Sequence, residues 1–135
     1  MRFVTVEGHP APKGSKRHVG RGRLIEQSKL LPAWQQRLRE ALADEMFIVD
    51  RQHPVELHVW FTMPRPKSRK HRHPYHVVTP DLDKLVRAVA DELTGTLIHD
   101  DGQVCRIRAE KTVAPVGDAW TGCQIMVRRL DMENM

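Results

Sequence analysis

The sequence predicts an α/β (α+β) fold, a mixed β-sheet with two helices, in one domain that covers residues 1–135. A chain of 135 residues suits a single domain with its own core. Four short segments alternate apolar and polar residues, as half-buried strands do, and two others repeat apolar residues at helical spacing. Their order is strand, helix, strand, helix, strand, strand, which favours two helices packed on one sheet.

The first half of the chain carries two of the strands and one helix. Residues 2–8 form the first expected strand, and residues 9–23, rich in Pro, Gly and basic side chains, are expected to form a basic loop. The first helix is expected from Pro32, a residue that suits the first helical position, to about Val49. The segment 55–63 then alternates, with its apolar residues on one face: Val55, Leu57, Val59, Phe61 and Met63.

The second half repeats this pattern with a helix and two strands. The second helix is expected to start near Thr79–Pro80, a capping residue followed by proline, and to end at Gly95. Alternation predicts strands over 103–113 and 121–129, the latter with Cys123, Ile125 and Val127 inward, and both cysteines are expected to be buried thiols. In segment 103–113 one charged residue, Lys111, shares the inner face with Cys105, Ile107, Ala109 and Val113.

Charge divides the chain into two unequal parts. Residues 1–80 carry 15 Lys and Arg against 7 Asp and Glu, a net +8, whereas residues 81–135 carry 7 against 10, a net −3. Clustered positive charge favours a polyanionic partner such as DNA over a purely solvated surface. No apolar run approaches the ~20 residues that span a bilayer, and the N-terminus lacks an apolar signal-peptide core, so we expect a cytoplasmic protein without a membrane partner.

The densest basic run, residues 65–76, leads directly into two acids, Asp81 and Asp83. Acids in a first helical turn are common because they interact favourably with the helix dipole. Residues two apart on a regular helix point about 200° apart, so both carboxylates can reach one ion only if Asp81 lies in non-helical backbone. Likewise, Asp100-Asp101-Gly102 is typical of a hairpin turn.

Together these residues indicate more than each does alone. Mg²⁺ prefers oxygen ligands, and two carboxylates at a helix start with one from a turn could supply them. Beside a basic loop, such a metal site suits phosphodiester hydrolysis, because the cations hold phosphate while the metal activates water. Lys111 would reach into this polar site, where the carboxylates offer it a partner. A zinc site at His71, His73 and His76 is disfavoured by the surrounding positive charge.

The segments "PDLDKLVRAVADELTG" and "IHDDGQV", followed by Lys111, resemble the RusA family of Holliday-junction resolvases, common in phages and prophages. The resemblance is specific over about residues 79–111. It implies a homodimeric α/β fold, nicking of four-way DNA junctions in pairs with Mg²⁺ (or Mn²⁺), and a host that is bacterial or phage-infected. It also implies metal ligation by Asp81, Asp83 and Asp101, with Asp100 as their neighbour.

Two positions depart from the family pattern. Lys84 stands where the DxDN motif has Asn, and Arg87 takes the place of the family's functional lysine. Arginine keeps the positive charge and can bind phosphate, but it is a poor proton donor. Arg87 can therefore take over an electrostatic role of the family's lysine but not a proton-transfer role.

The sequence therefore predicts a metal-dependent, structure-selective endodeoxyribonuclease that acts in DNA recombination and repair. Arg87 and Lys111 would stabilise the charged transition state. Backbone phosphate would be held by seven cations: Lys13, Lys16, Arg17, Arg65, Lys67, Arg69 and Lys70. The alternatives are a non-catalytic basic DNA-binding protein, whose acids only cap and turn, and an interaction protein that does not distinguish junctions from duplex.

Overall fold

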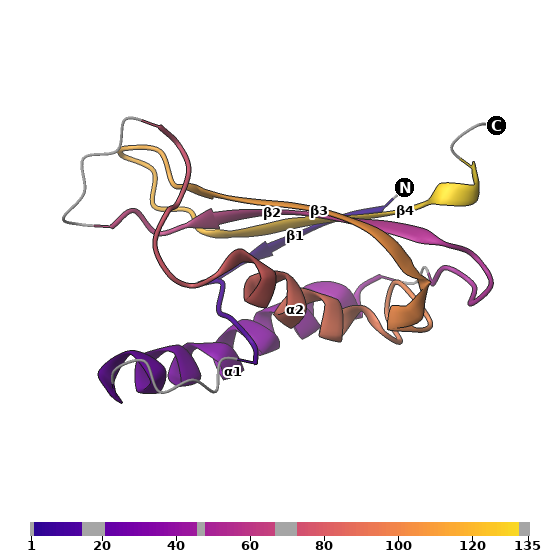
Figure 1. The fold of residues 1–135 in the computed structure, drawn as a ribbon, viewed down its shortest axis with the longest axis horizontal. Helices are drawn as coiled ribbons and strands as arrows, with labels where there is room; N and C mark the ends of the chain where they lie inside the picture. The colour runs from indigo at the N-terminus through magenta and orange to yellow at the C-terminus, as the bar shows by residue number, and fades with distance from the viewer. Residues whose placement is uncertain (1, 15–20, 46–47, 67–72, 133–135) are drawn as a thin grey trace.

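The computed structural model describes residues 2–14, 21–45, 48–66 and 73–132 (Figure 1). Its elements run β1 (Arg2–Glu7), α1 (Arg21–Ala43), β2 (Val55–Met63), α2 (Leu82–Leu93), β3 (Val104–Val113) and β4 (Gly122–Arg129). Short 3-10 turns, η1 (Asp101–Gln103) and η2 (Leu130–Met132), flank the last two strands. The predicted order and the α+β class are confirmed. Within the described residues, no helix is both long and apolar enough to cross a membrane.

The four strands form one mixed sheet in the order β1-β4-β2-β3. β1 and β2 run antiparallel to β4, whereas β2 and β3 run parallel. A parallel pair needs a crossover connection, and α2 lies in the one between β2 and β3. Both helices lie on the same side of the sheet, so that the opposite face carries no helix in the described part of the chain (Figure 1).

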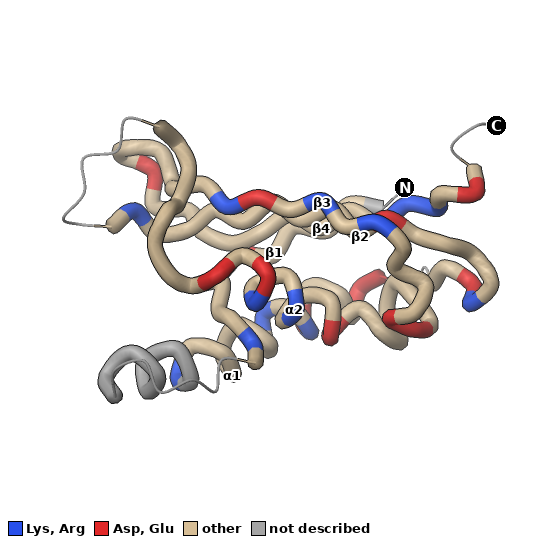
Figure 2. The backbone as a smooth tube through the Cα atoms, viewed as in Figure 1, with Lys and Arg blue, Asp and Glu red and all other residues tan. Residues whose placement is uncertain are grey.

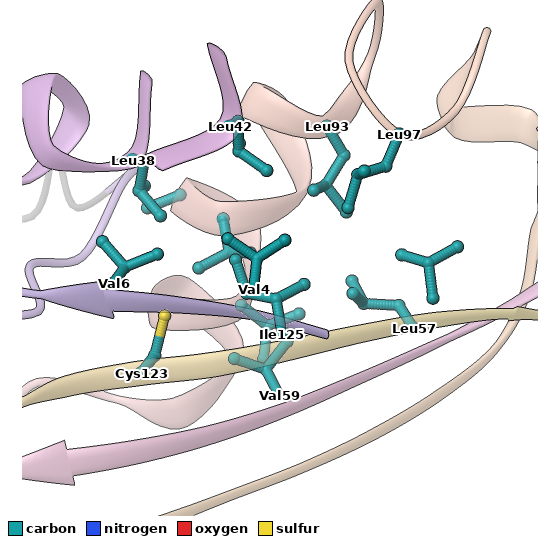
Figure 3. Packing of buried hydrophobic residues seen from close by; sticks show 14 of the residues in the cluster. Val4, Val6, Leu38, Leu42, Leu57, Val59, Leu93, Leu97, Cys123 and Ile125 are labelled. Atoms are coloured by element: carbon teal, nitrogen blue, oxygen red, sulfur yellow. The ribbon is translucent and has the colours of Figure 1, made fainter. Parts of the chain in front are cut away.

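The core fills the space between the sheet and the helices (Figure 3). All five apolar residues predicted for one face of β2 are buried, as are the three predicted for β4. The helices contribute the apolar stripes that their spacing predicts: Trp34, Leu38 and Leu42 from α1, and Leu85, Val86, Val89 and Leu93 from α2. The bare face is more polar. There Glu56 is fully buried and forms an ion pair with Arg128.

The predicted bounds of the first helix and the predicted start of the second are wrong. α1 begins at Arg21 and ends at Ala43, so Pro32 lies inside the helix and residues 21–23 are not loop. Proline inside a helix removes one backbone hydrogen bond, but packing of the Trp34, Leu38 and Leu42 stripe against the core stabilises α1 around it. α2 begins at Leu82 rather than near Thr79–Pro80, and it ends just before Gly95.

The prediction that both cysteines are buried is half correct. Cys123 is fully buried, and burial raises the pKa of its thiol. Cys105 is exposed and so is Ile107, although Ile107 pairs with the buried Leu57 and shares its face of the sheet. β3 is an edge strand, so Ile107 lies on the predicted face of the sheet and is still exposed, and Cys105 lies where the register between β2 and β3 shifts.

Candidate metal and nucleic-acid site

Asp81 and Asp83 lie at the start of α2 in two different backbone states. Asp81 is the residue before the first helical turn and has extended dihedrals, φ −67° and ψ 141°, whereas Asp83 is within that turn. The side chain of Asp81 makes no capping hydrogen bond, and both residues are exposed. Lys84 approaches Asp81, with 3.7 Å between Nζ and Oδ2. The condition for both carboxylates to reach one ion, an Asp81 outside the helix, is therefore met.

The extended backbone before Asp81 is held by β3. Lys111 Nζ donates hydrogen bonds to the carbonyls of Val78 and Pro80, each at 2.6 Å. The backbone N–H of His76 donates to the carbonyl of Lys111 at 3.2 Å, and that of Val113 donates to the carbonyl of Pro74 at 2.7 Å. The C-terminal end of β3 thus holds the segment 74–80 through these hydrogen bonds and an isolated bridge between Tyr75 and Thr112.

As the alternation along β3 predicts, Lys111 lies on the face of the sheet that the helices cover, opposite the buried Phe61 of β2. From there its side chain reaches the backbone carbonyls before α2. Burial lowers the pKa of its ammonium group, and the negative charge of Asp81 opposes that shift. The direct partners of the ammonium are backbone carbonyls. The sequence indicated the direction of this side chain but not these partners, which lie 31 and 33 residues earlier in the chain.

Asp101 lies at the other end of α2. Its Oδ1 accepts a hydrogen bond of 2.6 Å from Oγ1 of Thr94, the residue that closes the helix at its C-terminus. Asp81 precedes the N-terminus of the same helix, whose 12 residues span about 18 Å at 1.5 Å per residue. Figure 2 shows acidic stretches at both ends of α2. The three carboxylates predicted to hold one metal ion are therefore not gathered within this chain, where no group of three or more potential ligands occurs among the described residues.

The Asp100–Gly102 stretch forms the 3-10 turn η1 instead of the predicted hairpin. Asp100 and Gln103 form a capping box around this turn: the backbone N–H of Gln103 donates to the carbonyl of Asp100 at 3.0 Å, and the Gln103 side chain accepts from the backbone N–H of Asp100 at 3.0 Å. The buried Gln103 amide also donates to the carbonyls of Val49, Asp50 and His53. Sequence reasoning missed Gln103, although an acid followed by Gln three residues later is a capping-box signal.

Cations border the N-terminal half of α2. The backbone N–H of Lys13 donates to the carbonyl of Lys84 at 3.1 Å, and its ammonium pairs with Asp91 at 2.8 Å. Gly14 lies against Arg87, so closely that a Cβ at position 14 would be 2.9 Å from Nη1 of that guanidinium. The segment before residue 15 therefore runs beside the helix that carries Asp83, and it brings Lys13 there.

Of the other predicted phosphate-binding residues, Arg65 is the one that lies in the described part of the chain. Arg65 is half-buried, and its Nε has no hydrogen-bond partner among the described residues. His76, one of the three histidines weighed for zinc, is 5% exposed. Several residues lie outside the described ranges, and their predicted roles stay predictions: Lys16, Arg17, Lys67, Arg69, Lys70 and His71.

Comparison with protein-family models places most of this chain in a known family. A protein-family model described as endodeoxyribonuclease RusA matches residues 7–128, about nine-tenths of the chain. No curated protein matches it significantly. The matched range includes both carboxylate pairs, Arg87, Lys111 and both basic segments.

Proposed function

Because the chain belongs to the RusA endodeoxyribonuclease family, whose members act on Holliday junctions, we propose that it resolves four-way DNA junctions by metal-dependent, paired hydrolysis of phosphodiester bonds. The observation that carries the metal-dependent part is the start of α2. Asp81 occupies a capping position without capping, and Asp83 follows within one turn. Two exposed carboxylates free of a capping role are what a hard divalent cation requires of a protein.

Asp81, Asp83 and Asp101 would hold Mg²⁺, with Mn²⁺ as a substitute, and this ion would activate water and offset charge on the leaving oxygen. The chain's own cations would do the remaining electrostatic work. Arg87, held against Gly14, would stabilise negative charge on the scissile phosphate. Lys13 and Arg65, with Lys16, Arg17, Lys67, Arg69 and Lys70, would fix the DNA backbone without reading its sequence.

The rival function, a basic DNA-binding protein without catalysis, requires the acids to serve only as caps and turn residues. Asp100 fits that description because it and Gln103 form the capping box of η1. Asp81 does not, because its side chain makes no cap hydrogen bond. This contrast favours catalysis. Activity on junction DNA would place the protein in recombination and repair, in the cytoplasm of a bacterium or phage-infected host.

A homodimer follows from two independent arguments. A four-way junction offers two scissile strands related by a two-fold axis, and one domain carries a single carboxylate set, so paired cutting needs two chains. In addition, Asp101 lies about 18 Å from the Asp81 end of its own α2, a separation set by the helix length. We infer that Asp101 of the partner subunit completes each metal site beside Asp81 and Asp83.

The activity is tested with a labelled four-way junction, incubated with and without Mg²⁺. Wild-type protein is expected to cut only with the metal. Asp81→Asn is expected to lower the cleavage rate by at least roughly 100-fold, the scale on which removal of one electrostatic group acts in enzymes. Binding of the junction in EDTA should be retained or tightened, because the substitution removes negative charge beside a polyanion. Equal cleavage by both proteins would contradict the proposal.

Mixing subunits tests the shared site. A mixed dimer of Asp81→Asn and Asp101→Asn chains has one intact site if Asp101 acts across the interface, and none if it acts within its own chain. Each variant alone should be inactive, and the mixture should regain nicking of one strand. The matched control mixes Asp81→Asn with Asp83→Asn, which leaves no intact site in either arrangement. Failure of the first mixture to nick would exclude the shared site.

A further inference from the structure

We propose that Lys111 is a positioning residue, which holds Asp81 outside the α2 helix so that Asp81 and Asp83 can share one divalent cation. This inference rests on the metal site of the proposed function and assigns a part of it to a residue on a different element. It differs from the role that the sequence indicates for Lys111, stabilisation of the transition state.

The hydrogen bonds of Lys111 carry the proposal. A lysine ammonium has three N–H donors, and two of them are used on the carbonyls of Val78 and Pro80, both at 2.6 Å. Pro80 is the residue directly before Asp81, and Val78 lies two positions before Pro80. Hydrogen bonds to a charged donor are about twice as strong as neutral ones, so this pair of bonds is a firm restraint on the backbone.

The restraint acts on the feature that the metal site needs. Thr79 and Pro80 are by residue type a cap and a first helical residue, so local preference would place Asp81 inside the helix. There, Asp81 and Asp83 would point about 200° apart. In the structure the path from Val78 to Pro80 is bonded to β3 through Lys111, and Asp81 is extended.

Positioning and simple charge effects predict opposite signs for metal affinity. Lys111 is a cation whose charge is felt by Asp81. If charge were its main contribution, removing it would strengthen binding of a divalent cation to the carboxylates. If Lys111 holds Asp81 in place, removing it weakens that binding even though a repelling positive charge has been taken away.

The test measures Mn²⁺ affinity of the full-length protein by electron paramagnetic resonance of the free ion. Lys111→Met is expected to weaken Mn²⁺ binding by about 10-fold or more, the range found when residues that orient metal ligands are removed. Lys84→Met is the matched control, because Lys84 also lies near Asp81 but bonds its carboxylate rather than the backbone. It should leave Mn²⁺ affinity unchanged or raise it.

Thermal melting and junction binding in EDTA establish that the variants are folded. If Lys111→Met does not fold, Lys111→Leu serves in its place, since it too is neutral and lacks N–H donors, and the same sign decides. If the Lys111 variant binds Mn²⁺ as tightly as the wild type, or more tightly, the positioning role is overturned. The proposed nuclease function still holds in that case, provided that the wild-type protein binds Mn²⁺ and cuts junctions. Wild-type protein that neither binds Mn²⁺ nor cuts junctions overturns the proposed function itself.

Discussion

At the scale of single residues, two aspartates beside helical turns have different tasks. Asp100 forms the capping box of η1 with Gln103 and is hydrogen-bonded to it in both directions. Asp81 occupies the corresponding position before α2, yet its carboxylate makes no capping hydrogen bond to the backbone of the helix. Side chains that stabilise a fold are normally engaged in it, so an acid that could cap and does not is a candidate for binding a ligand.

Arg87 gives the clearest prediction at this scale, because arginine cannot donate a proton at ordinary pH. If its role is electrostatic, Arg87→Met should lower the single-turnover rate of junction cleavage by roughly 100-fold, and Arg87→Lys should keep most of it. The pH–rate profile of Arg87→Lys should follow that of the wild type below the pKa of lysine. A rate that rises well above wild type, with a new alkaline limb, would show that proton transfer is the missing function.

At the scale of elements, α1 contains a proline where helices rarely tolerate one. Pro32 is exposed, and the helix continues for 11 residues on either side of it, from Arg21 to Ala43. Proline removes one backbone hydrogen bond and its ring crowds the preceding turn. The part of α1 that follows Pro32 is held by Trp34, Leu38 and Leu42, all buried.

Replacement of this residue should therefore stabilise the protein. Pro32→Ala is expected to raise the free energy of unfolding in urea by up to about 3 kcal/mol, the penalty of proline in a helix interior. Gln36→Ala, another exposed position of α1, should change it by about 0.5 kcal/mol or less. A neutral or destabilising Pro32→Ala would mean that the helix does not run continuously through residue 32 in solution.

At the scale of the whole molecule, several separate segments meet at the N-terminal end of α2. The segment before residue 15 contributes Lys13 beside α2, and the chain from β2 to α2 passes from Arg65 through the basic run to Asp81. β3 holds the end of that connection through Lys111 and Thr112. In the sequence, the basic run 65–76 therefore ends only a few residues before Asp81 and Asp83.

The basic run should therefore contribute directly to DNA affinity. Changing Lys67, Arg69 and Lys70 to Ala is expected to weaken binding to junction and duplex alike. The slope of log affinity against log salt should fall by about 0.9 for each phosphate that the variant no longer neutralises. Arg51→Ala, in the exposed turn before β2, should leave the slope unchanged. An unchanged slope in the triple variant would mean that the run faces away from DNA.

The sequence by itself determined the element order, the inward faces of β2 and β4, and the carboxylates and cations that resemble a known nuclease family. These follow from short-range patterns: a strand alternates every two residues, and a motif lies within a few positions. Tertiary structure alone supplied the hydrogen bonds of Lys111 to carbonyls 31 and 33 residues away, just before the start of α2. It also decided that β3 is an edge strand, with Cys105 exposed, and that α2 separates Asp101 from Asp81. Strand order and long-range hydrogen bonds join residues far apart in the chain, and local periodicity carries no record of them.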